Sequence, residues 1–398
     1  MTTIISENQT ETGKGSATQI YPLNTSSPAV IALEKPKRLI SIDSIRGFDM
    51  LLISGGGTFL VLLENKTGLA WIDWLGMQLQ HPEWNGFTFY DFIFPLFLFI
   101  AGVSLPFSLN RGLESGLTKA DLYRKAFWRM AILIVLGILD KNHPVKFFEP
   151  DQIRVASVLG RIGIAGFITT LLYLNFSWQK RLLWVAGILL FYYAALFLIP
   201  VPGFGAGDLS IEGNLVGWFD RNFLPGRLLQ KIYDENGLLT QLPTLCLTVL
   251  GAMAGDILRN DWKESRKLQL LMLAGLTGIG LGLIWGMHFP INKHLWTSSF
   301  ILLTGGMAFI FLSFFYFIID IMKYQKWAFF FQVIGMNSLT IYLAYHFIDF
   351  YQTSDILFSG LYSPAPEQWH KAFEALGALA LVWSFMYFLY RKKIFIKI

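Results

Sequence analysis

Ten stretches of 14–25 mostly apolar residues follow one another along the chain, and their length restricts the fold more than any other feature. A helix rises 1.5 Å per residue, so about 20 residues cross the ~30 Å hydrocarbon core of a bilayer. The predicted spans are residues 45–63, 87–109, 126–139, 155–174, 182–201, 238–258, 268–287, 297–321, 329–347 and 372–390. We therefore expect an all-α, polytopic integral membrane protein with about ten transmembrane helices in one bundle.

The charge content is too low for a soluble protein. Charged residues make up 15% of the chain and hydrophobic residues 54%, whereas soluble domains are about 25% charged. The single cysteine, Cys246, excludes a disulfide framework and a Cys-based zinc cluster. The sequence lacks a phosphate-binding loop, a dinucleotide-binding glycine motif, a His-Glu-x-x-His motif and a Gly-x-Ser-x-Gly elbow. These observations leave a membrane enzyme or a transporter.

Basic residues fall mainly on one side of the predicted spans. With the N-terminus in the cytosol, 22 of the 32 Lys and Arg residues lie on cytosolic segments and nine lie on outer segments. This asymmetry predicts that both termini are cytosolic. Residues 1–37 are polar and contain no apolar signal-peptide core, so we expect a disordered cytosolic tail. The net charge of +5 then reflects topology and lipid headgroups, and it requires no nucleic acid.

Four groups of polar residues lie at membrane depth, where ionisable side chains are rare unless they pair or function. In chain order they are Asp43 with Arg46 and Asp49, His81 with Asp91, Arg161, and Asn337 with Ser338 and His346. Most of them also have a structural interpretation. Arg46 could set topology beside Asp43, Arg161 could pair with Asp91 or Asp49, and the ninth-span polar residues could bridge helices.

His81 is the residue best suited to chemistry. It lies on a loop beside Pro82, with Glu83 and Asp91 close in sequence. Imidazole titrates near neutral pH and is the side chain used most often for proton transfer. An inert interfacial histidine is the alternative.

Six sequence blocks resemble one known family. They are SIDSIRGFDM (41–50), HPEWNGFTFYDFIFPLFLFIAG (81–102), VLGRI (158–162), GLLTQLP (237–243), INKHLW (291–296) and GMNS (335–338). In this order they resemble the heparan-α-glucosaminide N-acetyltransferase family, particularly its bacterial members. The resemblance extends from about residue 38 to the C-terminus.

The resemblance implies a transmembrane acyltransferase domain over residues 38–398 that moves an acetyl group across the bacterial inner membrane. The donor would be cytosolic acetyl-CoA, and the acceptor the amine of a glucosamine-type sugar on the outer side. The family's functional histidine precedes a Trp-Asn-Gly motif, and that position is His81 here. A second active-site residue of the lysosomal relative, an Asn, has no clear counterpart, and residues 54–57 occupy its region.

The resemblance and the depth of the polar residues together suggest their roles. His81 would act as the base or accept the acetyl group transiently, and Asp91 would orient His81 or pair with Arg161. Candidates for binding the sugar or the thioester are Asn85, Asn292, Lys293, Asn337 and His346. Candidates for binding CoA are Arg46, Arg124, Lys125, Arg129 and Arg161. We expect no metal ion.

Two other functional classes remain open on the sequence. A secondary transporter of hexosamines or oligosaccharides would use a broken helix, and the glycine run at residues 55–57 could break the first span. A structural scaffold is the third class, and buried ionisable residues disfavour it. Gly278, Gly282 and Gly286 share one helical face, which predicts close packing within the chain or in a homodimer.

Overall fold

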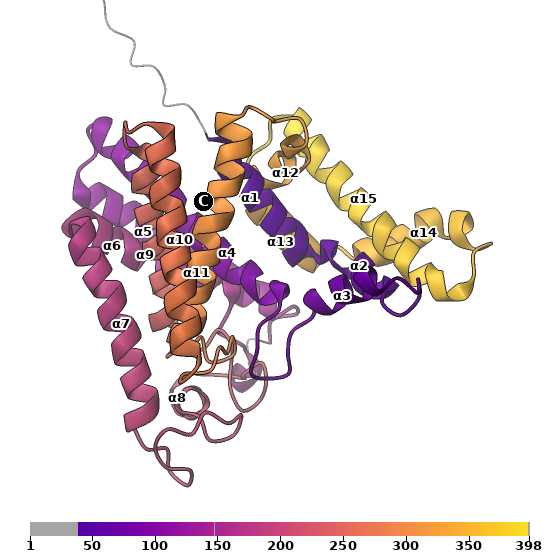
Figure 1. The fold of residues 1–398 in the computed structure, drawn as a ribbon. Coiled ribbons are helices and arrows are strands. Elements are labelled where there is room, and N and C mark those ends of the chain that lie inside the picture. Colours follow the sequence, from indigo (N-terminus) through magenta and orange to yellow (C-terminus); the bar gives the residue numbers. More distant parts are fainter. Residues whose placement is uncertain (1–38, 147, 397–398) are drawn as a thin grey trace, which may run out of the picture. The chain divides into compact units, whose positions relative to one another are not determined.

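The structure is a computed structural model that describes residues 39–146 and 148–396, so the predicted tail 1–37 lies outside the described residues. The described residues form helices and two isolated β-bridges but no strand, which confirms the all-α prediction (Figure 1). The helices are α1 (Ile40–Leu51), α2 (Thr58–Leu63), α3 (Ala70–Gln78), α4 (Phe89–Glu114), α5 (Lys119–Lys141), α6 (Val158–Asn175), α7 (Trp178–Leu198), α8 (Leu215–Phe223), α9 (Gln241–Arg259), α10 (Glu264–Gly286), α11 (Ser298–Phe315), α12 (Ala328–Gly335), α13 (Ser338–Phe347), α14 (Phe350–Tyr362) and α15 (His370–Arg391).

Seven of the described helical segments are long and apolar enough to cross a membrane. They are Phe89–Glu114, Val158–Asn175, Trp178–Leu198, Gln241–Arg259, Glu264–Gly286, Ser298–Ile321 and Glu367–Arg391. An eighth crossing is added if α12 and α13, which meet at a bend of 73°, count as one broken span.

Besides the bent ninth span, two predicted spans differ from a continuous apolar helix. The first, residues 45–63, is interrupted by a π-helical turn at Leu52–Gly56, where Gly55 has a φ of 80° that favours glycine. The third, residues 126–139, lies within α5, which is 23 residues long but carries charged residues over its first three turns. The helices are therefore present in both regions, and their breaks and charges distinguish them from the other spans.

Helix α4 packs against α1, α6, α9 and α11. Its crossing with α9 depends on two glycines. A Cβ atom at Gly102 would lie 2.1 Å from the carbonyl oxygen of Thr248, and one at Gly251 would lie 2.0 Å from that of Phe99. Larger residues would push the two backbones apart, so small residues here set the position of α4.

The glycine face of α10 packs within the chain. A Cβ atom at Gly278 would lie 2.9 Å from Gly306 of α11, and one at Gly282 would lie 2.5 Å from the backbone of Leu303. The intramolecular interpretation of these glycines is therefore confirmed.

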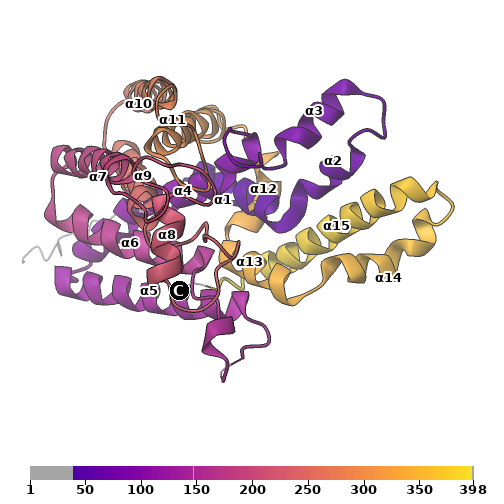
Figure 2. The same ribbon diagram turned by 90° about the horizontal axis from the view of Figure 1, so that it is seen from below.

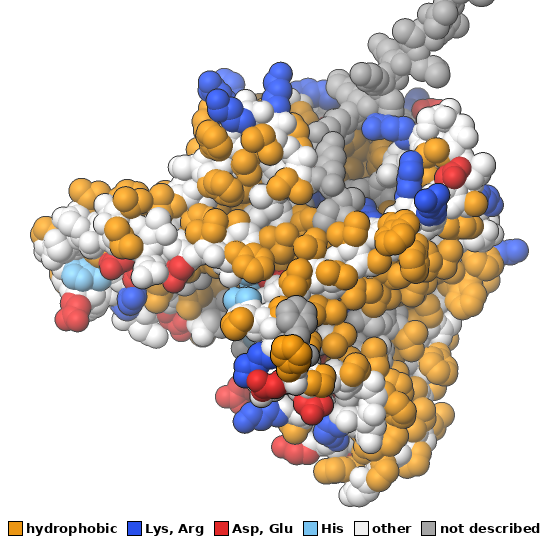
Figure 3. All heavy atoms as spheres, turned by 180° about the vertical axis from the view of Figure 1, so that it is seen from behind, with side chains coloured by type: hydrophobic (Ala, Val, Ile, Leu, Met, Phe, Trp, Pro, Cys, Tyr) orange, Lys and Arg blue, Asp and Glu red, His pale blue; other side chains and the backbone are white. Residues whose placement is uncertain are grey.

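The remaining helices flank this bundle. Figure 2 shows α14 and α15 side by side, with α2 and α3 next to α15, while α5, α6 and α7 lie on the other side of α4. On the face in Figure 3, hydrophobic side chains form a broad zone. Lys and Arg predominate at its upper end, whereas acidic and basic side chains mix at its lower end. Such extensive apolar surface is expected of a protein that faces lipid.

Candidate active site

His81 is held by the N-terminal turn of α4. Thr88 is the N-cap of this helix, and Asp91, three residues later, completes a capping box with it. One carboxylate oxygen of Asp91 accepts the backbone N–H of Thr88 at 3.1 Å. The other oxygen lies 2.7 Å from Nδ1 of His81. Asp91 is buried whereas the His81 side chain is 39% exposed, so a fixed carboxylate orients an accessible imidazole.

Lys293 completes a cluster of three charged or titratable side chains. Its Nζ atom lies 3.1 Å from Nε2 of His81 and 3.5 Å from the Asp91 carboxylate. Lys293 comes from the loop between α10 and α11, which is distant in sequence from His81. Burial lowers the pKa of Lys293, and the nearby carboxylates of Glu235 and Asp91 oppose that shift. The cluster thus combines a base, a carboxylate that orients it and a buried amine.

Two asparagines join the loops that carry His81 and Lys293. The side-chain amide of Asn292 donates to Oδ1 of Asn85 at 3.0 Å, and its own oxygen accepts the backbone N–H of Leu295 at 2.8 Å. The backbone N–H of Gly86 also donates to the carbonyl of Ile291 at 3.0 Å. Asn292 is fully buried. Both asparagines therefore position the cluster through their bonds to each other.

Glu235 adds a second carboxylate from the loop before α9. It accepts a bond from Nδ1 of His294 at 3.0 Å, and the His294 ring stacks on Trp84 with 5.2 Å between ring centroids. Burial works to raise the pKa of Glu235, but the bond to His294 and the charge of Lys293 hold it at about 2. Glu235 is therefore ionised at neutral pH.

These side chains surround a small cavity of about 170 Å³. It is lined by Ile53, His81, Tyr90, Ile93, Phe94, Val158, Glu235, Asn236, Lys293, Trp296 and Tyr342. Behind its wall, the guanidinium of Arg161 lies 4.8 Å from the centre of the Trp296 ring and bonds to Thr240. Arg161 has no salt bridge within the described residues, so the predicted ion pair with Asp91 or Asp49 is not formed. It supports Trp296 by a cation–π contact.

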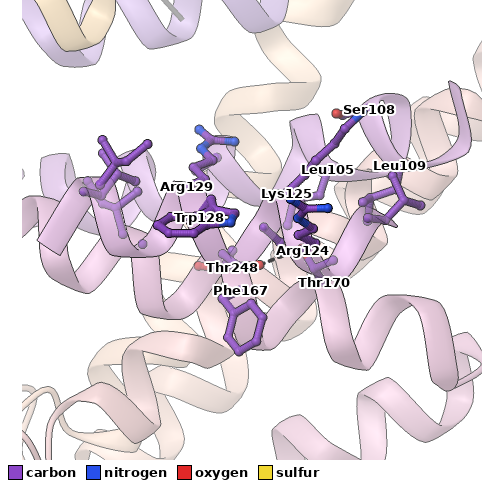
Figure 4. Close-up of a pocket in the computed structure, with 18 of the residues that line it drawn as sticks. Leu105, Ser108, Leu109, Arg124, Lys125, Trp128, Arg129, Phe167, Thr170 and Thr248 are labelled. Atoms are coloured by element: carbon purple, nitrogen blue, oxygen red, sulfur yellow. Dashed lines mark hydrogen bonds between the residues drawn. The ribbon is translucent and has the colours of Figure 1, made fainter. Parts of the chain in front are cut away.

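A larger cavity of about 690 Å³ lies between α4, α5, α6 and α9. Its lining includes three of the basic residues predicted to bind CoA: Arg124, Lys125 and Arg129. Figure 4 shows them on one stretch of α5 around Trp128, with Phe167 of α6 nearby. The cavity thus combines positive charges with aromatic rings.

The two cavities follow the same pair of helices. On α4, Phe94 lines the small cavity and Ala101 lines the large one, about 10 Å further along the helix. On α6, Val158 lines the small cavity and Ile162 lines the large one, about 6 Å away. A long, thin ligand along α4 and α6 could therefore contact both cavities.

Comparison with known proteins decides the family. A family model described as heparan-alpha-glucosaminide N-acetyltransferase, catalytic, matches residues 38–290, which is more than half of the chain. The chain belongs to this family. The heparan-alpha-glucosaminide N-acetyltransferases of Mus musculus and Homo sapiens are each 28% identical to it, over alignments that cover 96% of this chain. The same alignments cover 64% of each relative, so the chain spans less than two thirds of their length.

The region matched to the heparan-alpha-glucosaminide N-acetyltransferase family contains His81, Asp91 and Glu235 but ends before Lys293. This membership confirms the resemblance inferred from the sequence blocks. Within the described residues, no group of three or more His, Cys, Asp or Glu side chains is arranged to hold a metal ion.

Seven predicted site residues line neither cavity: Asp91, Asn85, Asn292 and Arg161, described above, and Arg46, Asn337 and His346. Arg46 donates to the Ser104 hydroxyl at 2.7 Å and pairs with Asp43 at 3.5 Å. Asn337, at the break between α12 and α13, donates to the carbonyl of Ile394 at 2.9 Å, consistent with the bridging interpretation. His346 lies 3.2 Å from Lys141 and 3.3 Å from Asp140. The same aspartate accepts a 3.1 Å bond from the hydroxyl of Tyr342, which lines the small cavity.

Sequence reasoning did not identify Glu235, Tyr90 or Trp296 as site residues. Glu235 lies in the polar run Asp234-Glu235-Asn236, just before the predicted sixth span. That position is the sequence feature that could have identified it as a site residue. Arg154 fixes that run, because its guanidinium donates two 2.8 Å bonds to Asp234. Tyr90 and Trp296 gave no signal, since aromatic residues at a membrane boundary are ordinarily interfacial anchors.

Proposed function

We propose that the protein is a transmembrane N-acetyltransferase that moves an acetyl group from cytosolic acetyl-CoA to the amine of a glucosamine-type sugar on the outer side. The observation that supports this most is the pair of cavities along α4 and α6, one basic and one containing the His81 cluster. Membership of the heparan-alpha-glucosaminide N-acetyltransferase family supports the reaction class.

The basic cavity binds the nucleotide end of acetyl-CoA in this proposal. Phosphates are recognised by Arg and Lys through charge-assisted hydrogen bonds, and Arg124, Lys125 and Arg129 supply such donors. The apolar faces of α4 and α6 then contact the pantetheine arm. The arm extends from the basic cavity towards His81, because a charged nucleotide does not enter hydrocarbon.

His81 removes the proton of the attacking amine. The Asp91 carboxylate accepts a bond from Nδ1–H of His81, so the lone pair lies on Nε2, which accepts a bond from the Lys293 ammonium until the substrate amine takes its place. Lys293, 3.1 Å from Nε2, provides a cation near the thioester carbonyl and stabilises the oxyanion that develops there.

The acceptor enters as an ammonium ion and is attracted to the acidic side of the small cavity. Glu235 lines that cavity and is ionised at neutral pH. A carboxylate near the acceptor favours amino sugars over neutral sugars, because it pairs with the ammonium group.

The first test is acetyl transfer by the purified protein in detergent. We expect free CoA to appear when acetyl-CoA is supplied with glucosamine, and no increase with N-acetylglucosamine, whose amine is blocked. A thiol reagent can measure CoA directly, since Cys246 is buried. A double variant, Lys125→Gln with Arg129→Gln, should raise the KM for acetyl-CoA about tenfold or more, because charge-assisted contacts are worth ~1.5–3 kcal/mol.

Lys263→Gln is the matched control, because Lys263 is an exposed basic residue outside the basic cavity. It should leave the KM for acetyl-CoA unchanged. The broken helix at Leu52–Gly56 and the bent α12–α13 pair also fit a transporter, which uses discontinuous helices. Thermal stabilisation by hexosamines without any by acetyl-CoA would favour the transporter and contradict the enzyme.

The proposal includes about ten spans in one bundle, in the bacterial inner membrane, with both termini in the cytosol. Single cysteines test this topology, since the native Cys246 is buried. Lys146→Cys, on the loop after α5, should react with an impermeant maleimide in intact cells. Lys263→Cys, on the loop before α10, should react only after permeabilisation. The reverse pattern would contradict the positive-inside assignment.

A further inference from the structure

Asp49, on α1, is a buried acid for which the proposed mechanism has no role yet. It is fully buried, and neither carboxyl oxygen has a hydrogen-bond partner within the described residues. The other acids buried to this degree all accept at least one bond: they are Asp91, Asp140, Asp220 and Asp234. An unpaired carboxyl group at membrane depth is expensive to keep unless it has a function.

Asp49 lies between the two cavities. Ile53, one turn further along the helix, lines the small cavity. Arg46, one turn before it, donates to Ser104 of α4, and Ser104 lies between lining residues of the basic cavity at positions 101 and 105. Residues three apart share a helix face, so Arg46 and Asp49 lie on one side of α1, and Ile53 follows in the π-helical turn Leu52–Gly56 that continues it.

Contacts with the neighbouring helix α4 also locate Asp49 between the two cavities. Ile53 and Ile93 line the small cavity together, and Arg46 bonds to Ser104. By its position between Arg46 and Ile53, Asp49 lies level with the part of α4 between positions 93 and 104, where the helix passes from one cavity to the other. In the proposed function, this is where the sulfur end of CoA lies when its acetyl group reaches His81.

A buried carboxyl group without a partner holds its proton, because an unpaired carboxylate in such surroundings costs many kcal/mol. We propose that Asp49 is the proton donor to the CoA sulfur when the thioester bond breaks. This inference rests on the proposed function. It adds a general acid on the far side of the acetyl group from His81, the general base.

The protons balance as follows. The sugar ammonium loses one proton before attack and a second as the amide N–C bond forms, both by way of His81. The C–S bond breaks, and the sulfur takes the Asp49 proton to give neutral CoA thiol. One of the two amine protons leaves to solution, and the other restores the proton of Asp49.

The test compares two donors, acetyl-CoA and its selenoester analogue, in which selenium replaces the sulfur. A selenol is a much stronger acid than a thiol, so selenolate leaves without protonation. Asp49→Asn should lower kcat with acetyl-CoA by about 100-fold or more and with the selenoester by only a few-fold. KM for acetyl-CoA should change little, because Asp49 does not line the basic cavity, where the nucleotide binds.

Two further measurements separate this role from a structural one. Ser41→Ala removes a buried hydroxyl of α1 that, like Asp49, has no hydrogen-bond partner in the described part of the chain, and it should leave activity with both donors unaffected. Wild type itself should show a larger solvent deuterium isotope effect on kcat with acetyl-CoA than with the selenoester. Equal losses with both donors, full activity of Asp49→Asn, or equal isotope effects in wild type would overturn the proposal. Failure of wild type to transfer acetyl groups would instead reject the proposed function.

Discussion

Replacing His81 with alanine should lower kcat for acetyl transfer by about 100- to 10,000-fold, the range that a positioned general base contributes. The reason is the geometry of the cluster: Asp91 holds Nδ1 at 2.7 Å, and Nε2 is directed towards Lys293 in the small cavity. No other histidine within the described residues lines that cavity. The KM for acetyl-CoA should stay close to that of wild type, since the nucleotide binds in the basic cavity.

His370→Ala provides the matched control. His370 lies at the start of α15 and bonds to the carbonyl of Ala365, outside both cavity linings. Its loss should leave kcat within a factor of two or so of wild type. If His81→Ala is folded and retains more than about a tenth of the wild-type kcat, a loss of only ~1.4 kcal/mol, then His81 is not an essential base or nucleophile.

The sequence predicted the His81–Asp91 pair as one of two alternatives for Asp91, the other being a pair with Arg161, because His81 and Asp91 lie in one short block. Their ten-residue separation spans one loop and the first helical turn, so local geometry brings them together. It also predicted Lys293, through the resemblance, as a residue that binds substrate. The direct contact between Lys293 and His81 could not be predicted, because it depends on how the α10–α11 loop folds onto the α3–α4 loop.

The asparagines show a different limit of sequence reasoning. A polar side chain at membrane depth is expected either to bind a ligand or to bridge helices, and composition does not distinguish the two. Asn85 and Asn292 bond to each other, and Asn337 bonds to the C-terminal segment. Glu235 was missed for the opposite reason: it lies in a loop between two predicted spans, where acidic residues are ordinary until the fold buries them.

The sequence predicted the positions of the helices better than it predicted where a helix is interrupted. Apolar length predicted where helices lie, because lipid leaves the backbone few alternatives. The π-helical turn at Leu52–Gly56 depends on packing from distant helices: a Cβ atom at Gly55 would lie 2.3 Å from the Tyr345 hydroxyl. Such a contact between the first and ninth predicted spans has no local sequence signal beyond the glycine itself.

Asp91→Asn should be the second most damaging substitution, although it changes the shape of the side chain little. In wild type, one carboxylate oxygen accepts the backbone N–H of Thr88 and the other accepts Nδ1–H of His81. Asparagine has one oxygen, and the backbone N–H of Thr88 requires it as an acceptor. The amide NH₂ group then faces Nδ1 of His81 and donates to it.

That bond would invert the tautomer of His81. With Nδ1 as the acceptor, the proton lies on Nε2, which can no longer accept a proton from the amine and which faces the Lys293 ammonium 3.1 Å away. We expect kcat to fall by about 100- to 10,000-fold, comparable to the loss known when a carboxylate that orients a catalytic histidine becomes an amide. The amide oxygen of asparagine can still accept the backbone N–H of Thr88, as an N3 Gln does in a capping box, so α4 should remain folded.

Thr88→Ala separates catalysis from helix capping. It removes the side-chain half of the capping box and the 2.6 Å bond from the Thr88 hydroxyl to the carbonyl of Gln80, and it should destabilise α4 by ~0.5–2 kcal/mol, whereas the His81–Asp91 bond does not involve that hydroxyl. We therefore expect opposite effects in the two variants. Asp91→Asn should keep the wild-type thermal midpoint but have a much lower kcat, whereas Thr88→Ala should have a lower midpoint but keep most of the wild-type kcat. Steady-state kinetics and thermal unfolding of both variants measure these effects. If the two variants lose activity in proportion to their loss of stability, Asp91 acts on α4 alone and has no role in holding the tautomer of His81.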